Sequence, residues 1–251
     1  MKKVKPAAVL CCVLCFLLLM PLQAKKEGAG VEPAEIIKKS IEAQGGRAVL
    51  ESVIDSVVTA SCKFYTPQGE YLGERKVFST SEPMKIRIEQ TVLGTETIIG
   101  YDGEKTWLQQ AGRTMKAPAT IHDSIEAALS REDFLLRYKE KGIQAEYQGE
   151  NQVEESPCHT IKFTDGDGDE TLYYFDVDTF LPLKVEYDAP DETGKIIRSE
   201  SINSDFRKVE NMMMPFKSVF LADSEKVMET MITEIKINQG LDESLFSMPE
   251  K

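Results

Sequence analysis

The sequence predicts a mainly β protein with added helices, of the α+β class, built on one long antiparallel sheet. Between residues 57 and 238 about a dozen short strand-like runs follow one another, separated by turn residues. Runs such as 84–89, 160–163 and 227–237 alternate apolar and polar side chains. Because successive strand side chains point to opposite faces, this alternation indicates a sheet with one apolar face. A sheet of this length must curl to cover that face, and it then encloses a packed core or a cavity.

The N-terminus has the pattern of a cleaved export signal. Three lysines (Lys2, Lys3 and Lys5) precede an apolar run over residues 7–20, and the segment ends in the small residue Ala24. This is the order a signal peptidase recognises. The run is shorter than the roughly 20 apolar residues that span a bilayer. We therefore expect residues 1–24 to be a signal peptide, residues 25–251 to form one domain, and the mature protein to be periplasmic.

Charge and cysteine content narrow the function classes further. The chain carries a net charge of −12, and loss of the three signal lysines leaves 27 basic against 42 acidic residues, or −15. That charge argues against nucleic acid and anionic lipid surfaces as partners. Cys62 and Cys158 remain after export. They could form one disulfide or pack as separate buried thiols, and their spacing leaves both alternatives open.

A helix is predicted ahead of the strands. Glu32 and Pro33 have the pattern of a helix start, Ile36, Ile37 and Ile41 form an apolar stripe, and two glycines after residue 44 end it. Apolar residues at helical spacing over 47–56 predict a second short helix.

Turn residues then divide the chain into twelve predicted strands and one central helix. The central helix covers residues 121–141, carries an apolar stripe that includes Ile125 and Leu129, and ends at Gly142. A final short segment, 241–246, is predicted to be a helical turn. The predicted strands cover 57–65, 71–79, 84–92, 95–101, 105–110, 143–149, 158–164, 171–176, 181–188, 195–207, 215–221 and 226–238.

The sequence contains no recognisable catalytic motif. Its two histidines, His122 and His159, belong to no metal-binding pattern, and His159 shares a strand face with apolar residues, as a structural histidine does. Residues 165–169 alternate Asp and Gly and partly fit a calcium loop, but Glu170 stands where that loop needs Gly. Asp-Gly between two strands is also ordinary hairpin chemistry. We therefore predict no catalytic residue, no metal and no cofactor, and a protein that is not an enzyme.

Four stretches carry a resemblance to a known family. They are Ile-Glu-Ala-Gln-Gly-Gly at 41–46, Tyr-Asp-Gly-Glu-Lys-Thr-Trp at 101–107, the segment from Tyr173 to Tyr187, and the pair of segments at 205–216 and 235–249. In this order they resemble the Lol-type periplasmic lipoprotein carriers, and specifically the LolA/LolB-like outer membrane lipoprotein-sorting proteins. The chain departs from the pattern at 210–212, where relatives more often have Asp-Gly.

The resemblance implies a fold and a ligand class. The fold would be a single unclosed antiparallel β-barrel of about eleven strands, with helices plugging the open side around an apolar cavity. The function would be that of a monomeric carrier, which binds acyl chains of lipoproteins or another lipid and moves them across the periplasm without catalysis. An envelope membrane protein would load it or receive the cargo. Neither that partner nor the lipid is identified by the sequence.

An envelope protein-interaction or sensor module is the alternative, with the same half-barrel as a docking surface and a filled core. For the carrier, we expect the helix over 121–141 to cover the cavity. Six strand residues are expected on the concave face because each alternates with polar neighbours: Met84, Ile86, Ile88, Trp107, Ile161 and Phe163. On this interpretation Trp107→Ala would keep the fold and weaken lipid binding. The predicted ligand-binding residues are Phe64, Met84, Ile86, Ile88, Trp107, Ile125, Leu129, Ile161, Phe163 and Val185.

Overall fold

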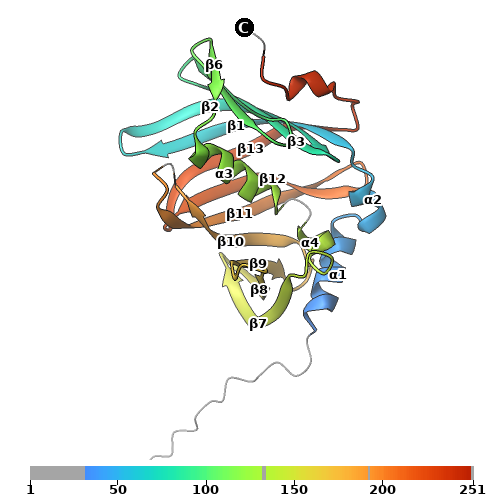
Figure 1. Cartoon of the computed structure of the whole chain (residues 1–251). Coiled ribbons are helices and arrows are strands. Elements are labelled where there is room, and N and C mark those ends of the chain that lie inside the picture. Colours follow the sequence, from blue (N-terminus) through green and yellow to red (C-terminus); the bar gives the residue numbers. More distant parts are fainter. Residues whose placement is uncertain (1–31, 132–133, 192, 250–251) are drawn as a thin grey trace, which may run out of the picture.

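The fold is one antiparallel sheet of thirteen strands that bends around three short helices (Figure 1). The computed structural model describes residues 32–131, 134–191 and 193–249, so the predicted signal peptide lies outside the described residues. The strand order is β6-β5-β4-β3-β2-β1-β13-β12-β11-β10-β9-β8-β7. Because β6 and β7 end the order and do not pair with each other, the barrel is unclosed, as predicted.

The elements have the following bounds. The helices are α1 (Pro33–Ala43), α2 (Arg47–Glu51), α3 (Ala119–Leu129), α4 (Phe134–Arg137) and the 3₁₀ turn η1 (Glu243–Leu245). The strands are β1 (Asp55–Thr66), β2 (Gly69–Ser81), β3 (Met84–Val92), β4 (Thr95–Tyr101), β5 (Thr106–Gln110), β6 (Arg113–Lys116), β7 (Gln144–Val153), β8 (Ser156–Thr164), β9 (Glu170–Asp176), β10 (Pro182–Pro190), β11 (Ile196–Val209), β12 (Met212–Ala222) and β13 (Glu225–Ile237).

The sequence signals at α1 determine where this helix begins and ends. Pro33 occupies the first turn, where its missing N–H costs no hydrogen bond. Ile36 and Ile37 are buried, and Gly45 follows the helix with a φ of 127°. A Cβ at Gly45 would lie 2.5 Å from the Asn211 carbonyl oxygen, so both the backbone angle and the close approach require glycine there.

All twelve predicted strands are present, two details differ from the sequence prediction, and one open alternative is decided. β6 is an additional strand of four residues. The predicted helix over 121–141 is two helices, α3 and α4. Cys62 and Cys158 are free, buried thiols on β1 and β8, which are six strands apart in the sheet, so the disulfide alternative does not apply.

The helices define an inner face of the sheet. Directly paired residues of neighbouring strands project to the same face, so the strand register assigns each side chain to one face. α1 and α4 pack against Ile161, Phe163 and the aromatic residues of β9, and α3 packs against β3 and β4. The register places all these contacts on the same face of the sheet, which we call the inner face.

The C-terminal segment covers part of the opposite, outer face. Phe246 is fully buried against Val57 and Phe78. The Asp55 carboxylate accepts hydrogen bonds from the backbone N–H groups of residues 239, 240 and 241, and Arg87 Nη1 donates to the Leu245 carbonyl oxygen over 3.1 Å. The sheet therefore has apolar cores on both faces at this end.

Within the described ranges, no helix is both long enough and apolar enough to cross a membrane.

Candidate functional site

An apolar row of paired side chains crosses eight strands on the inner face. Successive cross-strand pairs connect its members from β1 to β7. All members except one serine are apolar or aromatic. We call this set the inner row, and it consists of Phe64, Met228, Phe220, Ser201, Val185, Tyr173, Ile161 and Tyr147.

Only one end of the inner row is covered by helices. Tyr173 and Ile161 are buried beneath α1 and α4. Phe64, Met228 and Phe220, on β1, β13 and β12, are only half-buried and belong to none of the buried clusters of the described residues. A half-buried apolar surface on the inner side of a curved sheet is suited to an apolar ligand.

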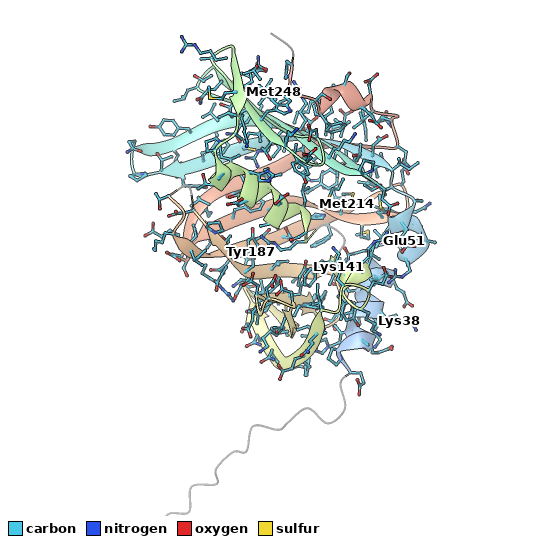
Figure 2. All side chains as sticks on the ribbon, in the orientation of Figure 1. Lys38, Glu51, Lys141, Tyr187, Met214 and Met248 are labelled. Atoms are coloured by element: carbon cyan, nitrogen blue, oxygen red, sulfur yellow. The ribbon has the colours of Figure 1, made fainter. Side chains whose placement is uncertain are left out.

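Helix α3 connects the two sides of this surface. Ile125 and Leu129 pack on β3 and β4, and α3 also contacts β5 and β10. Just after the end of α3 the Arg131 guanidinium lies over the Tyr187 ring of β10, 3.7 Å from its centroid. Figure 2 shows the position of Tyr187 on β10. In the order of the sheet, β10 and β5 lie on opposite sides of β1, β13, β12 and β11, so α3 extends over these central strands (Figure 1).

Two polar contacts attach α3 to the sheet. His122 Nδ1 lies 2.8 Å from Thr106 Oγ1, and Thr106 is buried. The Tyr101 hydroxyl lies 3.0 Å from the Gly103 carbonyl oxygen and 3.4 Å from Glu126 Oε1. Burial and the Glu126 carboxylate raise the pKa of Tyr101, so the phenol remains a hydrogen-bond donor at neutral pH.

Two hollows lined by described residues lie beside these helices. One, of about 440 Å³, lies at the end of α3 and is lined by Met84, Tyr101 and Leu129 among others. The other, of about 1100 Å³, is an open groove between α1 and α4, lined by apolar residues and by charged residues of both signs. The first hollow borders the apolar cluster under α3 but is also lined by polar residues, including Ser81, Glu126 and Lys141. The second lies at the covered end of the inner row.

Five of the predicted ligand-binding residues form one cluster. Met84, Ile86 and Ile88 project from the inner face of β3, and Ile125 and Leu129 of α3 pack onto them together with Ile99 and Tyr101. The predicted position of this helix over the apolar face is therefore confirmed for α3.

Four further predicted residues also lie on the inner face but differ in exposure. Phe64 and Val185 are half-buried members of the inner row. Ile161 and Phe163 are fully buried by α1, α4 and the aromatic side chains of β9. The last two thus belong to a packed core in this structure.

Trp107 lies on the other face from the one predicted. Trp107 on β5 pairs with Gly100 on β4, and Gly100 pairs with Arg87 on β3. Arg87 in turn pairs with Phe78 of the outer-face core, so Trp107 also projects to the outer face. Its indole Nε1 donates to the Phe246 carbonyl oxygen over 2.7 Å, and the side chain is only 1% exposed. The prediction that Trp107 shares the concave face with Ile86 and Ile88 is wrong, because the C-terminal segment forms a second apolar core.

The polar motifs have local structural roles. His159 lies beside Tyr147 and Phe180, on the face that carries Ile161. Asp165 Oδ1 accepts hydrogen bonds from the backbone N–H groups of Asp167 and Asp169, which closes the β8–β9 turn. In the part of the chain that the structure describes, no three His, Cys, Asp or Glu side chains are grouped so that they could hold a metal ion.

Three inner-face residues were not identified as site residues from the sequence. Phe220 stands between Val219 and Leu221, and Met228 follows Val227, so apolar residues at successive positions hide which face each side chain takes. Arg75 projects from the inner face of β2, where it pairs with Ala60 and Gln90. It lies in the charged run Glu74-Arg75-Lys76, which gives no indication that one of the three side chains points inward.

Comparisons with known proteins support the fold. No family model matches the chain, and no curated protein matches its sequence. Among solved structures, a putative outer membrane lipoprotein-sorting protein domain from Vibrio parahaemolyticus has a TM-score of 0.57 at 13% identity, and the match covers 85% of this chain and 95% of that one. A DUF1329 family protein from Desulfovibrio piger has a TM-score of 0.56 at 14% identity, with 86% and 98% covered.

A LolA superfamily protein from Nitrosomonas europaea is similar to the same degree, with a TM-score of 0.55 at 14% identity and 87% and 98% covered. The fold that the sequence resemblance implied, a LolA-like unclosed barrel with helices, is therefore confirmed, with thirteen strands in place of about eleven.

Proposed function

We propose that this protein is an exported, non-catalytic carrier that binds acyl chains of lipoproteins or of another lipid and moves them across the periplasm. The observation that carries the proposal is the half-buried part of the inner row, Phe64, Met228 and Phe220, in a sheet that α3 crosses. Burying such a surface against an acyl chain contributes about 25 cal/mol per Å² of apolar area removed from water.

The dimensions of the inner row suit a long chain. From β1 to β10 it crosses four interstrand spacings of ~4.8 Å, or about 19 Å along the sheet. The single hydroxyl in this stretch, that of Ser201, lies 3.4 Å from Asn203 Oδ1. An acyl chain along the row would therefore contact mainly carbon atoms, and the half-buried Val185 would extend the contact to β10.

A charge placed in the inner row tests the binding surface. Met228→Glu puts a carboxylate among the apolar side chains, and burying it beneath an acyl chain is costly. We expect the variant to bind a fluorescent fatty-acid probe at least ~10-fold more weakly than the parent. Met231→Glu is the matched control, because Met231 is on the same strand, projects to the other face and is 51% exposed. Equal binding by the two variants would remove the inner row from the site.

Native mass spectrometry of the protein purified from the periplasm tests the cargo. A co-purified lipid or acylated peptide, with a stoichiometry near one, is the expected result. Its mass would also identify the lipid class. If the purified protein carries no lipid and also binds no acyl probe, the carrier proposal is contradicted.

The groove between α1 and α4 favours a second candidate, a docking module for another envelope protein. It is lined by charged residues of both signs, including Glu35, Lys39, Arg47 and Lys139, around the exposed edges of apolar side chains. A polar rim around an apolar centre is typical of protein interfaces. A protein partner captured by the parent and lost on charge reversal of Lys39 and Lys139, without any acyl binding, would favour this candidate.

A further inference from the structure

Arg75 is a cation on the inner face without an acidic partner. Its Nε and Nη2 both donate to Gln90 Oε1, over 3.1 and 2.6 Å, and these are its only hydrogen bonds to described residues. No ion pair joins it to any described carboxylate. Its inner-face neighbours by register are Ala60 and Gln90, and the next inner positions on β2 are Gly73 and Val77. None of these side chains is acidic.

The surroundings of Arg75 are apolar and partly desolvated. Val77 pairs with Ile88 of the α3 cluster, and the Phe64 ring lies over Gly73, where a Cβ would be 3.1 Å from Phe64 Cε2. Burial lowers the pKa of Arg75. Burial also raises the pKa of the nearby Cys62 thiol, which is therefore neutral at neutral pH and supplies no counter-charge. A desolvated cation with no counter-charge is costly to keep in a folded protein.

The guanidinium retains free donors toward the inner face. Nη1 of Arg75 and Nε2 of Gln90 make no hydrogen bond to any described residue. Among the described residues no fully buried side-chain nitrogen or oxygen lacks a partner, so both of these donors remain accessible. The Nε–Nη2 edge of the guanidinium is engaged by Gln90, whereas Nη1 and the Gln90 amide can still donate to a carboxylate.

We propose that Arg75, with Gln90, binds the carboxylate head of a single-chain amphiphile whose acyl tail lies along the inner row. This inference rests on the proposed function and specifies its ligand as a long-chain fatty acid. One guanidinium neutralises one negative charge, whereas a phosphate monoester would retain up to one uncompensated charge beside Val77 and Phe64. On β2, Gly73 stands between Arg75 and Tyr71, the register partner of Phe64 on β1, so the head site lies two inner positions from the beginning of the inner row.

The test compares ligands that share a C16 chain and differ in the head group. Palmitate, hexadecanol and hexadecyl phosphate are titrated into the mature parent protein and into Arg75→Met. We expect the parent to bind palmitate more tightly than the other two. Arg75→Met should weaken palmitate binding by about 10- to 100-fold and leave hexadecanol binding unchanged, because only the head-group contact is lost. Arg75→Lys retains the charge but not the fork and should show an intermediate loss.

Lys76→Met is the matched control, since Lys76 is the next residue of the same strand, is exposed and projects to the outer face. It removes the same charge and should leave all three affinities unchanged. Thermal unfolding of each variant verifies that the fold is retained, and removing an unpaired buried charge should not lower stability.

Three outcomes would overturn the inference. They are equal binding of palmitate and hexadecanol by the parent, a palmitate preference that survives in Arg75→Met, and tighter Arg75-dependent binding of hexadecyl phosphate than of palmitate. In all three the parent still binds an acyl ligand, so the carrier proposal stands. Failure of the parent to bind any of the three ligands would overturn the carrier proposal itself and this inference with it.

Discussion

Trp107→Ala is expected to lower the free energy of unfolding by about 3–5 kcal/mol, the usual cost of truncating a buried aromatic side chain. The indole is 1% exposed, packs over Gly100 of the neighbouring strand and donates to the Phe246 carbonyl oxygen. Its loss leaves a cavity and an unpaired carbonyl group, and it loosens the C-terminal segment. For a chain of this length the thermal midpoint should fall by roughly 6–20 °C, measured by circular dichroism.

The control is Met115→Ala on the adjacent strand β6, where the side chain is 45% exposed and truncation should cost less than about 1 kcal/mol. The sequence analysis expected Trp107→Ala to weaken lipid binding, and a binding measurement tests that expectation against the structure. Because Trp107 lies on the outer face, folded Trp107→Ala should retain the acyl affinity of the parent. A stable Trp107→Ala protein with weakened probe binding would show that the indole contacts the ligand.

Phe163→Ala is expected to be as destabilising, again by about 3–5 kcal/mol. The ring is fully buried and lies edge-on to Phe134 and Tyr138 of the α4 region, at centroid distances of 5.0 and 5.6 Å, and 5.4 Å from the Tyr173 ring. Such aromatic pairs contribute about 0.5–1.5 kcal/mol each beyond burial. Denaturant unfolding measures the loss.

Hydrogen exchange should localise this effect. In Phe163→Ala the amides of α1 and α4 should exchange faster, while those of α3, which packs on β3 and β4, should keep their protection. Leu72→Ala serves as the control, because this side chain is 76% exposed. It should alter neither the free energy of unfolding nor the amide exchange rates. Faster exchange in α3 as well would show that the two inner clusters unfold as one unit.

The strands and the overall architecture could be predicted from the sequence because each depends on local patterning. Strand-like runs bounded by turn residues, several of them alternating, located every strand except β6, which has four residues and no apolar period. Gly45 and Gly46 marked the end of α1, and Asp-Gly turns marked hairpins such as the one at 165–169, because these residues adopt backbone angles that others avoid.

The face on which each side chain lies depends on register and on segments distant in the sequence, so the site was predicted only in part. Trp107 is followed by Leu108, and apolar residues at successive positions indicate that both faces of a strand are covered. The segment that covers the outer face, around Phe246, is 139 residues away in the chain. The inward orientation of Arg75 likewise depends on its pairing with Ala60 and Gln90, which no local pattern reveals.

Photo-labelling with a palmitate that carries a diazirine in its chain tests the central claim, that an acyl chain binds along the inner row. After irradiation and digestion, mass spectrometry should find the label on β1, β13 and β12, at or beside Phe64, Met228 and Phe220. Excess unlabelled palmitate should abolish it. Label that unlabelled palmitate abolishes, but that is confined to the C-terminal segment on the outer face or to the groove between α1 and α4, would contradict binding along the inner row.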